Sequence, residues 1–466
     1  MSENSSPSTA ALPIAVVGAG PIGLAAAAHL LERGLEPLVL EAGPSAASAV
    51  RAWGHVRLFS AWSELVDPAA ARLLEPAGWT RPEPTRYPTG AEWVEWYLQP
   101  LADVLGERVR YSTTVTGAAR RGRDRMVDSG REDQPFTLHT RDADGIEVRL
   151  QVRAIIDATG TFTSPNPLGS DGLPAAGEHA HRDRISYLAP DTADPSVRTR
   201  HAGRRTAVVG SGHSALTALL SLADLAEDEP GTRAVWVLRR GQVGNAFGGG
   251  ESDELPARGA LGLRAKEAVT AGHIEVVQGF RTERVEAGSG QVVLVADDGR
   301  RIEGLDHVIG LTGFRPDHSW QSELRLTLDE RLQAPVKLAP LIDPNQHSCG
   351  TVYPHGVAEL GHHEQGVFLV GMKSYGRAPT FLAMTGYEQV RSVAAALAGD
   401  HEAAARVELT LPDTGVCGGA GLFDDADADP DAAQSEGGCC TTPVPAPLSI
   451  GPGTGIGAPS PSSSSC

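Results

Sequence analysis

The glycine pattern that directly follows the first apolar strand constrains this chain more than any other feature. The segment VVGAGPIGLAAAAHL (16–30) runs from a short buried-strand candidate into a helical pattern. In it, Gly18, Gly20 and Gly23 have the spacing G-x-G-x-x-G. The first glycine permits a tight turn, the second lets the backbone approach a diphosphate, and the third lets the helix pack closely on the strand. The diphosphate would lie at a helix N-terminus, where free N–H groups and the helix dipole favour an anion.

The next apolar strand, PLVLEA (37–42), ends in a carboxylate, that of Glu41. A carboxylate at this point accepts hydrogen bonds from the hydroxyl groups of a ribose. Strand, glycine turn, helix, strand and terminal acid therefore follow one another in the order of a dinucleotide-binding unit. The residues predicted to bind are Gly18, Gly20, Pro21, Gly23 and Glu41.

A second fingerprint, VVGSGHSALTALLSL (208–222), repeats this arrangement with Ala215 in place of the third glycine. The strand after it, AVWVL, ends not in an acid but in Arg239 and Arg240. An acid would repel a 2′-phosphate, whereas arginine binds one through charge-assisted hydrogen bonds. The pattern therefore favours NADPH over NADH. The residues predicted to bind it are Gly210, Ser211, Gly212, Ser214, Arg239 and Arg240.

Two further strands, in AIIDATGTF (154–162) and HVIGLTGFRPD (307–317), each end in a Thr-Gly turn that would pass close to a nucleotide. With the two fingerprints, this order resembles the superfamily that contains thioredoxin reductase and the flavin-containing monooxygenases, over about residues 13–411. The resemblance implies FAD on the first fold, NADPH on the second, and hydride transfer between them. It extends the expected FAD-binding set to Phe59, Ser60, Thr159, Gly160, Gly371 and Met372.

The expected fold is α/β, with two Rossmann-like dinucleotide-binding domains, because continuous apolar strands alternate with helical patterns. The strands would end at Val17, Leu40, Ala158, Val209, Leu238, Ile309 and Val370, and the helical patterns lie at 22–33, 91–105, 214–226 and 385–398. The NADP domain (166–305) would be inserted in the FAD domain, which it divides into an N-terminal segment (13–165) and a C-terminal segment (306–412). A loose N-terminus (1–12) would precede them. The cysteine-containing tail (413–466) is rich in Gly, Asp, Pro and Ser and would be disordered.

The cysteines separate two branches of the superfamily. The first cysteine is Cys349, so the core lacks the C-x-x-C or paired dithiol that a disulfide reductase of this superfamily needs beside its flavin. The segment RAWGHVRLFSAWSEL (51–65) resembles the aromatic stretch of flavin monooxygenases. Two departures are Gly371-Met372 in place of the family's Gly-Asp, and Ala175 in place of the Phe of F-x-G-x-x-x-H. The aromatic residues are equally explained by core packing.

The late segment 347–399 and the tail resemble flavoproteins encoded with arsenic-resistance genes, which implies a trivalent arsenical as substrate. Cys349 and His355 are candidate substrate contacts, because the loop before the last strand lies near the flavin in this fold. Trivalent arsenic is soft and prefers thiolates, and Cys417, Cys439 and Cys440 could supply three. Three functions stay open: a flavin monooxygenase or oxidase, a thiol or metalloid reductase that uses the vicinal cysteines, and a non-catalytic metalloid-binding flavoprotein.

Charge and composition limit the partners. The formal net charge of −18 argues against nucleic acid and anionic membranes. The N-terminal segment lacks the pattern of a signal peptide, so a cytoplasmic protein is expected. The expected partners are a small-molecule or metalloid substrate, oxygen and, as a homodimer, a second copy of the chain.

Overall fold

The computed structural model describes residues 9–241, 243–250, 253, 255–288, 290–345, 354–379 and 381–409. Cys349, Cys417, Cys439 and Cys440 lie outside these residues, as does the whole predicted tail 413–466.

Five short parallel strands form the first sheet, in the order β16-β7-β1-β2-β3. Their bounds are Ile14–Val17 (β1), Pro37–Leu40 (β2), Val109–Arg110 (β3), Ala154–Asp157 (β7) and Val367–Leu369 (β16). Every residue of β1, β2, β7 and β16 is buried, as expected for parallel strands covered on both faces. Because β16 pairs with β7, a strand from late in the chain completes a sheet that the first third began.

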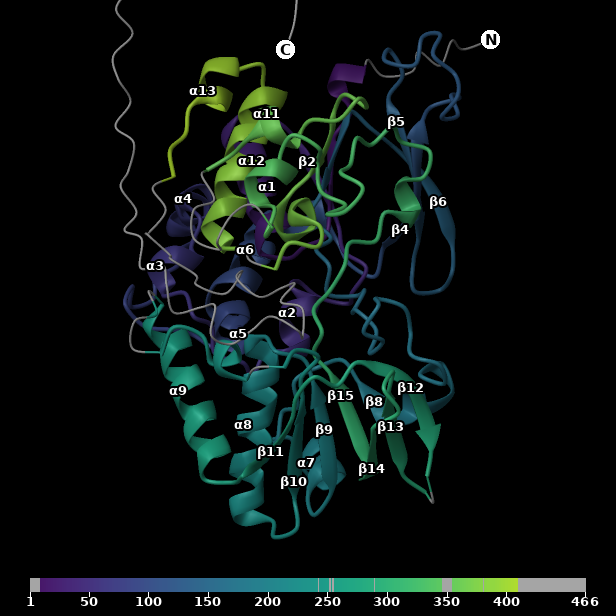
Figure 1. Ribbon diagram of the computed structural model, residues 1–466. Helices are drawn as coiled ribbons and strands as arrows, with labels where there is room; N and C mark the ends of the chain where they lie inside the picture. The colour runs from purple at the N-terminus through teal and green to yellow at the C-terminus, as the bar shows by residue number, and fades with distance from the viewer. Residues whose placement is uncertain are drawn as a thin grey trace, which may run out of the picture. The chain divides into compact units, whose positions relative to one another are not determined.

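Helices cover one face of this sheet. They are α1 (Pro21–Glu32), α4 (Pro68–Leu74), α6 (Gln99–Leu105) and α12 (Ala383–Leu397). Figure 1 shows α1 and α12 next to each other. They pack so closely that a Cβ at Gly386 would lie 2.5 Å from Ile22 Cδ1. The helix predicted over 91–105 is α5 (Gly90–Trp93) continued through a π-helical turn, η3 (Val94–Leu98), into α6.

An antiparallel sheet covers the other face. It consists of β4 (Thr114–Arg120), β5 (Phe136–Arg141) and β6 (Glu147–Val152). Phe136 and Leu138 of β5 are fully buried against β1 and β7 residues. This sheet was not predicted.

The second parallel sheet has the order β11-β10-β9-β15-β8. Its strands are β8 (Ile185–Ser186), β9 (Arg205–Val209), β10 (Arg233–Val237), β11 (Ile274–Val277) and β15 (His307–Gly310). Helices α8 (His213–Asp228) and α9 (Pro256–Thr270) lie on one face, side by side in Figure 1. An antiparallel sheet of β12 (Thr282–Ala287), β13 (Val292–Ala296) and β14 (Arg301–Leu305) lies on the other.

Smaller elements complete the described chain. They are η1 (Thr9–Ala11), α2 (Ser48–Ala52), α3 (Trp62–Leu65), η2 (Glu75–Ala77), η4 (Gly106–Arg108), η5 (His179–Arg184), α7 (Pro195–His201), η6 (Gly244–Phe247), η8 (Ser319–Gln321), α10 (Ala339–Ile342), α11 (Val357–Leu360), η9 (Gly371–Tyr375) and α13 (His401–Ala405). Within the described ranges, no helix combines the length and apolar character that crossing a membrane requires.

The predicted α/β class with two Rossmann-like parallel sheets is confirmed. Along the chain, the strands of the second sheet lie between β7 and β16, which are neighbours in the first sheet. The domain division, with its boundary after residue 305, stays a prediction. β15 follows that boundary and pairs with β9 of the second sheet.

Candidate functional sites at two glycine turns

The first glycine turn is closely packed on its protein side. Gly18 has φ +102°, and a Cβ there would lie 2.8 Å from the carbonyl oxygen of Ala158. A Cβ at Gly23 would lie 1.9 Å from the oxygen of Gly18. At Gly20, by contrast, no atom lies within 4 Å of the Cβ position, so the backbone is open to a ligand there. Pro21 begins α1, and Gly20 caps it without a side-chain hydrogen bond. The turn therefore fits a diphosphate at the helix N-terminus.

Glu41, which follows β2, holds this turn through hydrogen bonds of its carboxylate. Its Oε2 accepts a hydrogen bond from the backbone N–H of Ala19 at 2.7 Å, and its Oε1 accepts one from Gly43 at 2.8 Å. A carboxylate has about four lone-pair sites, so two such bonds leave capacity for ribose hydroxyls. The predicted ribose acceptor thus lies beside the predicted diphosphate turn.

The second glycine turn has the same construction. Gly210 has φ +139°, and a Cβ there would lie 2.2 Å from the carbonyl oxygen of Leu311. Gly212 again has nothing within 4 Å of its Cβ position and caps α8 without a side-chain bond. Ser211 is exposed and Ser214 is exposed beside it, whereas Ala215, at the third position, is fully buried. This turn therefore also fits a dinucleotide.

The two arginines after β10 lie where the prediction put them in the chain. The Arg239 side chain is exposed and donates a hydrogen bond to the carbonyl oxygen of Ser170 at 3.0 Å. The Arg240 side chain is half-buried, and its carbonyl oxygen accepts from the N–H of Gly279 at 2.8 Å. The role of both arginines in binding a 2′-phosphate stays a prediction.

The Thr-Gly turn after β7 is built around a buried acid that the prediction missed. The N–H and Oγ1 of Thr159 both donate to Asp157 Oδ1, at 3.0 and 2.7 Å. Gly160 follows with φ +66°. The Nζ of Lys373 lies 2.8 Å from Asp157 Oδ2 and donates to Thr159 Oγ1 at 2.9 Å. The visible signal was an acid inside the apolar strand AIID, because a buried carboxylate requires a partner.

The turn after β16 packs on the first glycine helix. Gly371 has φ +67°, and a Cβ there would lie 3.1 Å from Ile22 Cγ1 of α1. Its N–H donates to Gln389 Oε1 at 2.7 Å. Met372, where the superfamily has an acid, is half-buried. Since β16, β7 and β1 are neighbours, the turns that follow them meet at one edge of the sheet.

His355 lies behind this turn. It is 3% exposed, and its Nε2 accepts a hydrogen bond from the Gln389 amide nitrogen at 2.8 Å. The same nitrogen donates to Ser374 Oγ at 2.8 Å. His355 therefore orients the amide that holds Gly371, and this geometry lends no support to a substrate contact. That role stays a prediction for His355, and Cys349 lies outside the described residues.

The aromatic segment divides between the core and the second turn. Trp62 is fully buried and stacks on Trp96 with ring centroids 6.0 Å apart, as the core-packing interpretation expected. Phe59 instead lies edge-on to His213, the first residue of α8, at 5.4 Å. Ser60 is half-buried just before α3. Phe59 is thus a point of contact between the first domain and the second glycine turn.

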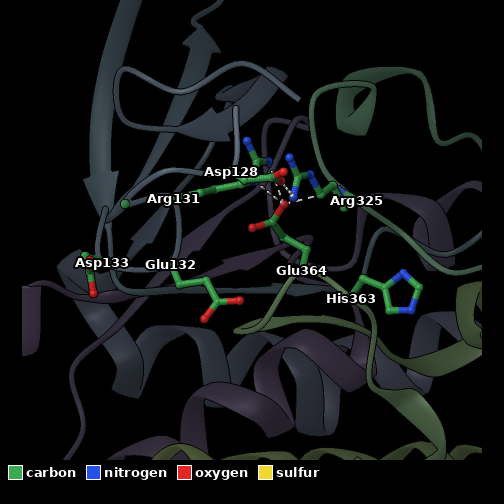
Figure 2. Close-up of a pocket in the computed structure, with 8 residues that line it drawn as sticks. Asp128, Arg131, Glu132, Asp133, Arg325, His363 and Glu364 are labelled. Carbon is green, nitrogen blue, oxygen red and sulfur yellow. Dashed lines mark hydrogen bonds and ion pairs between the residues drawn. The ribbon is translucent and has the colours of Figure 1, made fainter. Parts of the chain in front are cut away.

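A charged cavity of about 290 Å³ lies elsewhere (Figure 2). Its lining residues are Asp128, Gly130, Arg131, Glu132, Asp133, Arg325, His363 and Glu364, none of which belongs to a glycine turn. Burial raises the pKa of Glu364, but hydrogen bonds from Arg131 and Arg120 outweigh it, so the pKa is lowered overall. Among the residues that the structure describes, no cluster of three or more His, Cys, Asp or Glu side chains could hold a metal.

Comparison with known proteins identifies the family. The family model described as pyridine nucleotide-disulphide oxidoreductase matches residues 15–346, and the chain belongs to this family. The chain is therefore an oxidoreductase, and the match supports FAD and NADP(H) as its two cofactors.

Individual relatives include both reductases and an oxygenase. A ferredoxin–NADP reductase of Ignicoccus hospitalis is 25% identical over 335 residues, 69% of this chain and 86% of its own length. The indole-3-pyruvate monooxygenase YUCCA1 of Oryza sativa subsp. japonica is 32% identical over 209 residues, 44% of each chain. Among solved structures, the bacillithiol disulfide reductase Bdr (YpdA) from Bacillus cereus has a TM-score of 0.62 at 18% identity, covering 83% of this chain and 99% of its own.

Proposed function

We propose that this chain is an FAD- and NADPH-dependent monooxygenase or oxidase that acts on a soft nucleophile, with trivalent arsenic as arsenite or an organoarsenical the first candidate. The observation that carries the binding of two dinucleotides is the pair of glycine turns, built alike on two separate parallel sheets. When bound, FAD would take a hydride from NADPH and pass electrons to oxygen.

The chain's own residues would bind and orient the two cofactors. The turn from Gly18 to Gly23 would hold the FAD diphosphate, and Glu41 would accept from its ribose. The turn from Gly210 to Ser214 would hold the NADPH diphosphate. Arg239 and Arg240 would bind the 2′-phosphate, because a guanidinium pairs with phosphate through two parallel hydrogen bonds.

An oxygenase is favoured over a dithiol reductase because the sequence holds no cysteine before Cys349. Neither the first helix nor any other segment before residue 349 can therefore supply a redox pair next to the flavin. The reductase alternative has its own support, since the ferredoxin–NADP reductase aligns over most of its length. In that alternative, Cys439 and Cys440 would carry electrons from the flavin to a thiol or metalloid.

The tail cysteines would serve the oxygenase as a trap for the substrate. Trivalent arsenic binds thiolates, and Cys417, Cys439 and Cys440 could provide three. A flexible chain from residue 413 to 439 would have an r.m.s. reach of roughly 28 Å. Such a tail could deliver the arsenical to the flavin of its own subunit or of a second copy in a homodimer. We expect the protein to work in the cytoplasm, where thiols stay reduced.

The test measures NADPH consumption with and without oxygen, in the presence and absence of arsenite or methylarsenite. The proposal expects arsenical-stimulated turnover that requires oxygen. The variant C439S/C440S removes two of the three proposed thiolate ligands and should raise the arsenical concentration for half-maximal turnover by at least about tenfold. Its rate of anaerobic flavin reduction by NADPH should be unchanged, and C466S serves as the matched control.

Other results point to the alternatives. Anaerobic, arsenical-dependent turnover that C439S/C440S abolishes would establish the reductase. Tight arsenical binding without any stimulation of NADPH consumption would leave a metalloid-binding flavoprotein. Loss of flavin reduction itself in C439S/C440S would contradict the role assigned to the tail.

A further inference from the structure

A buried lysine lies at the edge of the first sheet where the three turns meet. Lys373 is 1% exposed, and Asp157, its ion-pair partner, is fully buried. The Nζ of Lys373 also donates to the Oγ1 of Thr159 and, at 2.6 Å, to the carbonyl oxygen of Asp317. All of these partners come from outside its own segment, 371–375.

The contacts of Lys373 join three stretches of the chain. Asp157 and Thr159 form the turn after β7, and Lys373 itself lies in η9, which follows β16. Asp317 and Trp320 belong to the segment that returns from the second sheet, and the Nζ lies 5.6 Å from the centre of the Trp320 ring. One ammonium group therefore links the turn after β7, the turn after β16 and the returning segment.

The arrangement costs free energy that packing alone does not require. Burying an ion pair removes two charges from water, and well-packed apolar residues of similar volume often stabilise a fold as much or more. In addition, Asp157 Oδ2 has no hydrogen-bond partner among the described residues and is held by the ion pair alone. A buried ion pair such as that of Lys373 and Asp157 is expected where the precise position of the surrounding backbone matters more than the stability of the fold.

We propose that Lys373 is a positioning residue for FAD, which acts by holding the Thr159 turn and the Asp317 segment in the form that the cofactor binds. This inference rests on the proposed function in one respect, the binding of FAD by the first sheet. Lys373 holds Thr159 Oγ1 in a fixed orientation, because that oxygen donates to Asp157 and accepts from Lys373. The next residue, Gly160, then begins the chain's path toward the second sheet.

The experiment titrates each apoprotein with FAD, follows the flavin fluorescence, and measures the melting temperature in parallel. K373M preserves side-chain length and removes the ammonium. D157N/K373M removes both charges and leaves an amide oxygen that can still accept from Thr159. R391M is the matched control, because Arg391 forms a buried ion pair with Glu388 and donates to the carbonyl oxygens of Ala403 and Arg406, away from the three turns.

K373M should raise the Kd for FAD at least about tenfold, the effect of one lost hydrogen bond to a charged group. D157N/K373M should recover most of the melting temperature yet still bind FAD at least about tenfold more weakly. R391M should lower the melting temperature while leaving the Kd within about twofold of wild type. If K373M does not fold, the Kd for FAD and the melting temperature of D157N/K373M are compared with those of R391M instead.

Three results would overturn the inference and leave the proposed function standing. They are wild-type FAD affinity in K373M, full recovery of affinity in D157N/K373M, and equal losses of affinity in K373M and R391M, which would reflect general instability. A wild-type chain that binds no FAD would overturn the proposed function as well, so the two failures are distinguishable.

Discussion

At the scale of the residue, one motif position shows how local packing decides which side chain a turn tolerates. Gly23 and Ala215 occupy the same place in the two fingerprints. A Cβ at Gly23 would lie 1.9 Å from the carbonyl oxygen of Gly18, an approach that backbone atoms cannot relieve cheaply. Ala215 carries a Cβ at the equivalent place and is fully buried without such a clash.

The first prediction follows from that contrast. G23A should destabilise the fold by roughly 1–3 kcal/mol, the usual cost of overpacking a core, and lower the FAD content of the purified protein. The reciprocal change, A215G, should cost only about 1 kcal/mol, the helix penalty of glycine, and leave NADPH binding intact. Urea unfolding and flavin absorbance check both, and equal effects of the two variants would contradict the packing argument.

At the scale of the element, a pair of histidines joins α7 to the second sheet. His201 ends α7, is buried, and forms a hydrogen bond through its Nδ1 with Thr206 Oγ1 of β9 at 3.0 Å. Its ring lies 5.3 Å from that of His307, the first residue of β15. Burial, followed by the nearby His307 and Arg200, lowers the pKa of His201 to about 4.

The second prediction concerns stability against pH. In the unfolded chain, His201 has an ordinary histidine pKa of about 6.5. Between pH 6.5 and about 4, His201 is therefore protonated in the unfolded chain and neutral in the folded chain. The free energy of unfolding should therefore fall as the pH falls through this window, by up to roughly 3 kcal/mol from His201. In H201Q the fall should be smaller, as measured by urea unfolding at pH 7, 6 and 5. An unchanged slope would show that His201 does not titrate in this way.

At the scale of the whole molecule, the first sheet must be completed after a long insertion, and Glu364 helps to do this. It precedes β16 and accepts hydrogen bonds from Arg120 at 2.8 Å and from Arg131 at 2.6 Å, residues more than 230 positions earlier. All three side chains are buried, and the Arg120 guanidinium also lies 3.8 Å from the centre of the Phe136 ring. The ion pairs of Glu364 with Arg120 and Arg131 therefore connect the segment before β16 to β4 and to the segment between β4 and β5.

The third prediction tests this fastening. E364Q should destabilise the fold by roughly 3–5 kcal/mol, because it leaves two buried guanidinium groups without a charge partner. The control E147Q removes the partner of Arg141 in an exposed pair and should have little effect. The melting temperatures of the two variants check the comparison, and similar values would argue against a role for Glu364 in closing the sheet.

The two glycine turns, and most of the strands and helices around them, could be predicted from the amino-acid sequence. The predicted strands end within one residue of β1, β2, β7, β9, β10, β15 and β16, and the four predicted helices correspond to α1, the 90–105 helix, α8 and α12. These features are readable because hydrophobic period and glycine spacing are local properties of a chain.

The contacts that hold these turns in place could be seen only in the folded chain. Lys373 meets Thr159 across 214 residues, and Glu364 meets Arg120 across 244. The antiparallel sheets β4–β6 and β12–β14, and the depth at which His355 lies, were equally out of reach of the sequence. The physical reason is that a buried charge finds its partner through the fold, and no local pattern in the sequence records which distant residue that partner is.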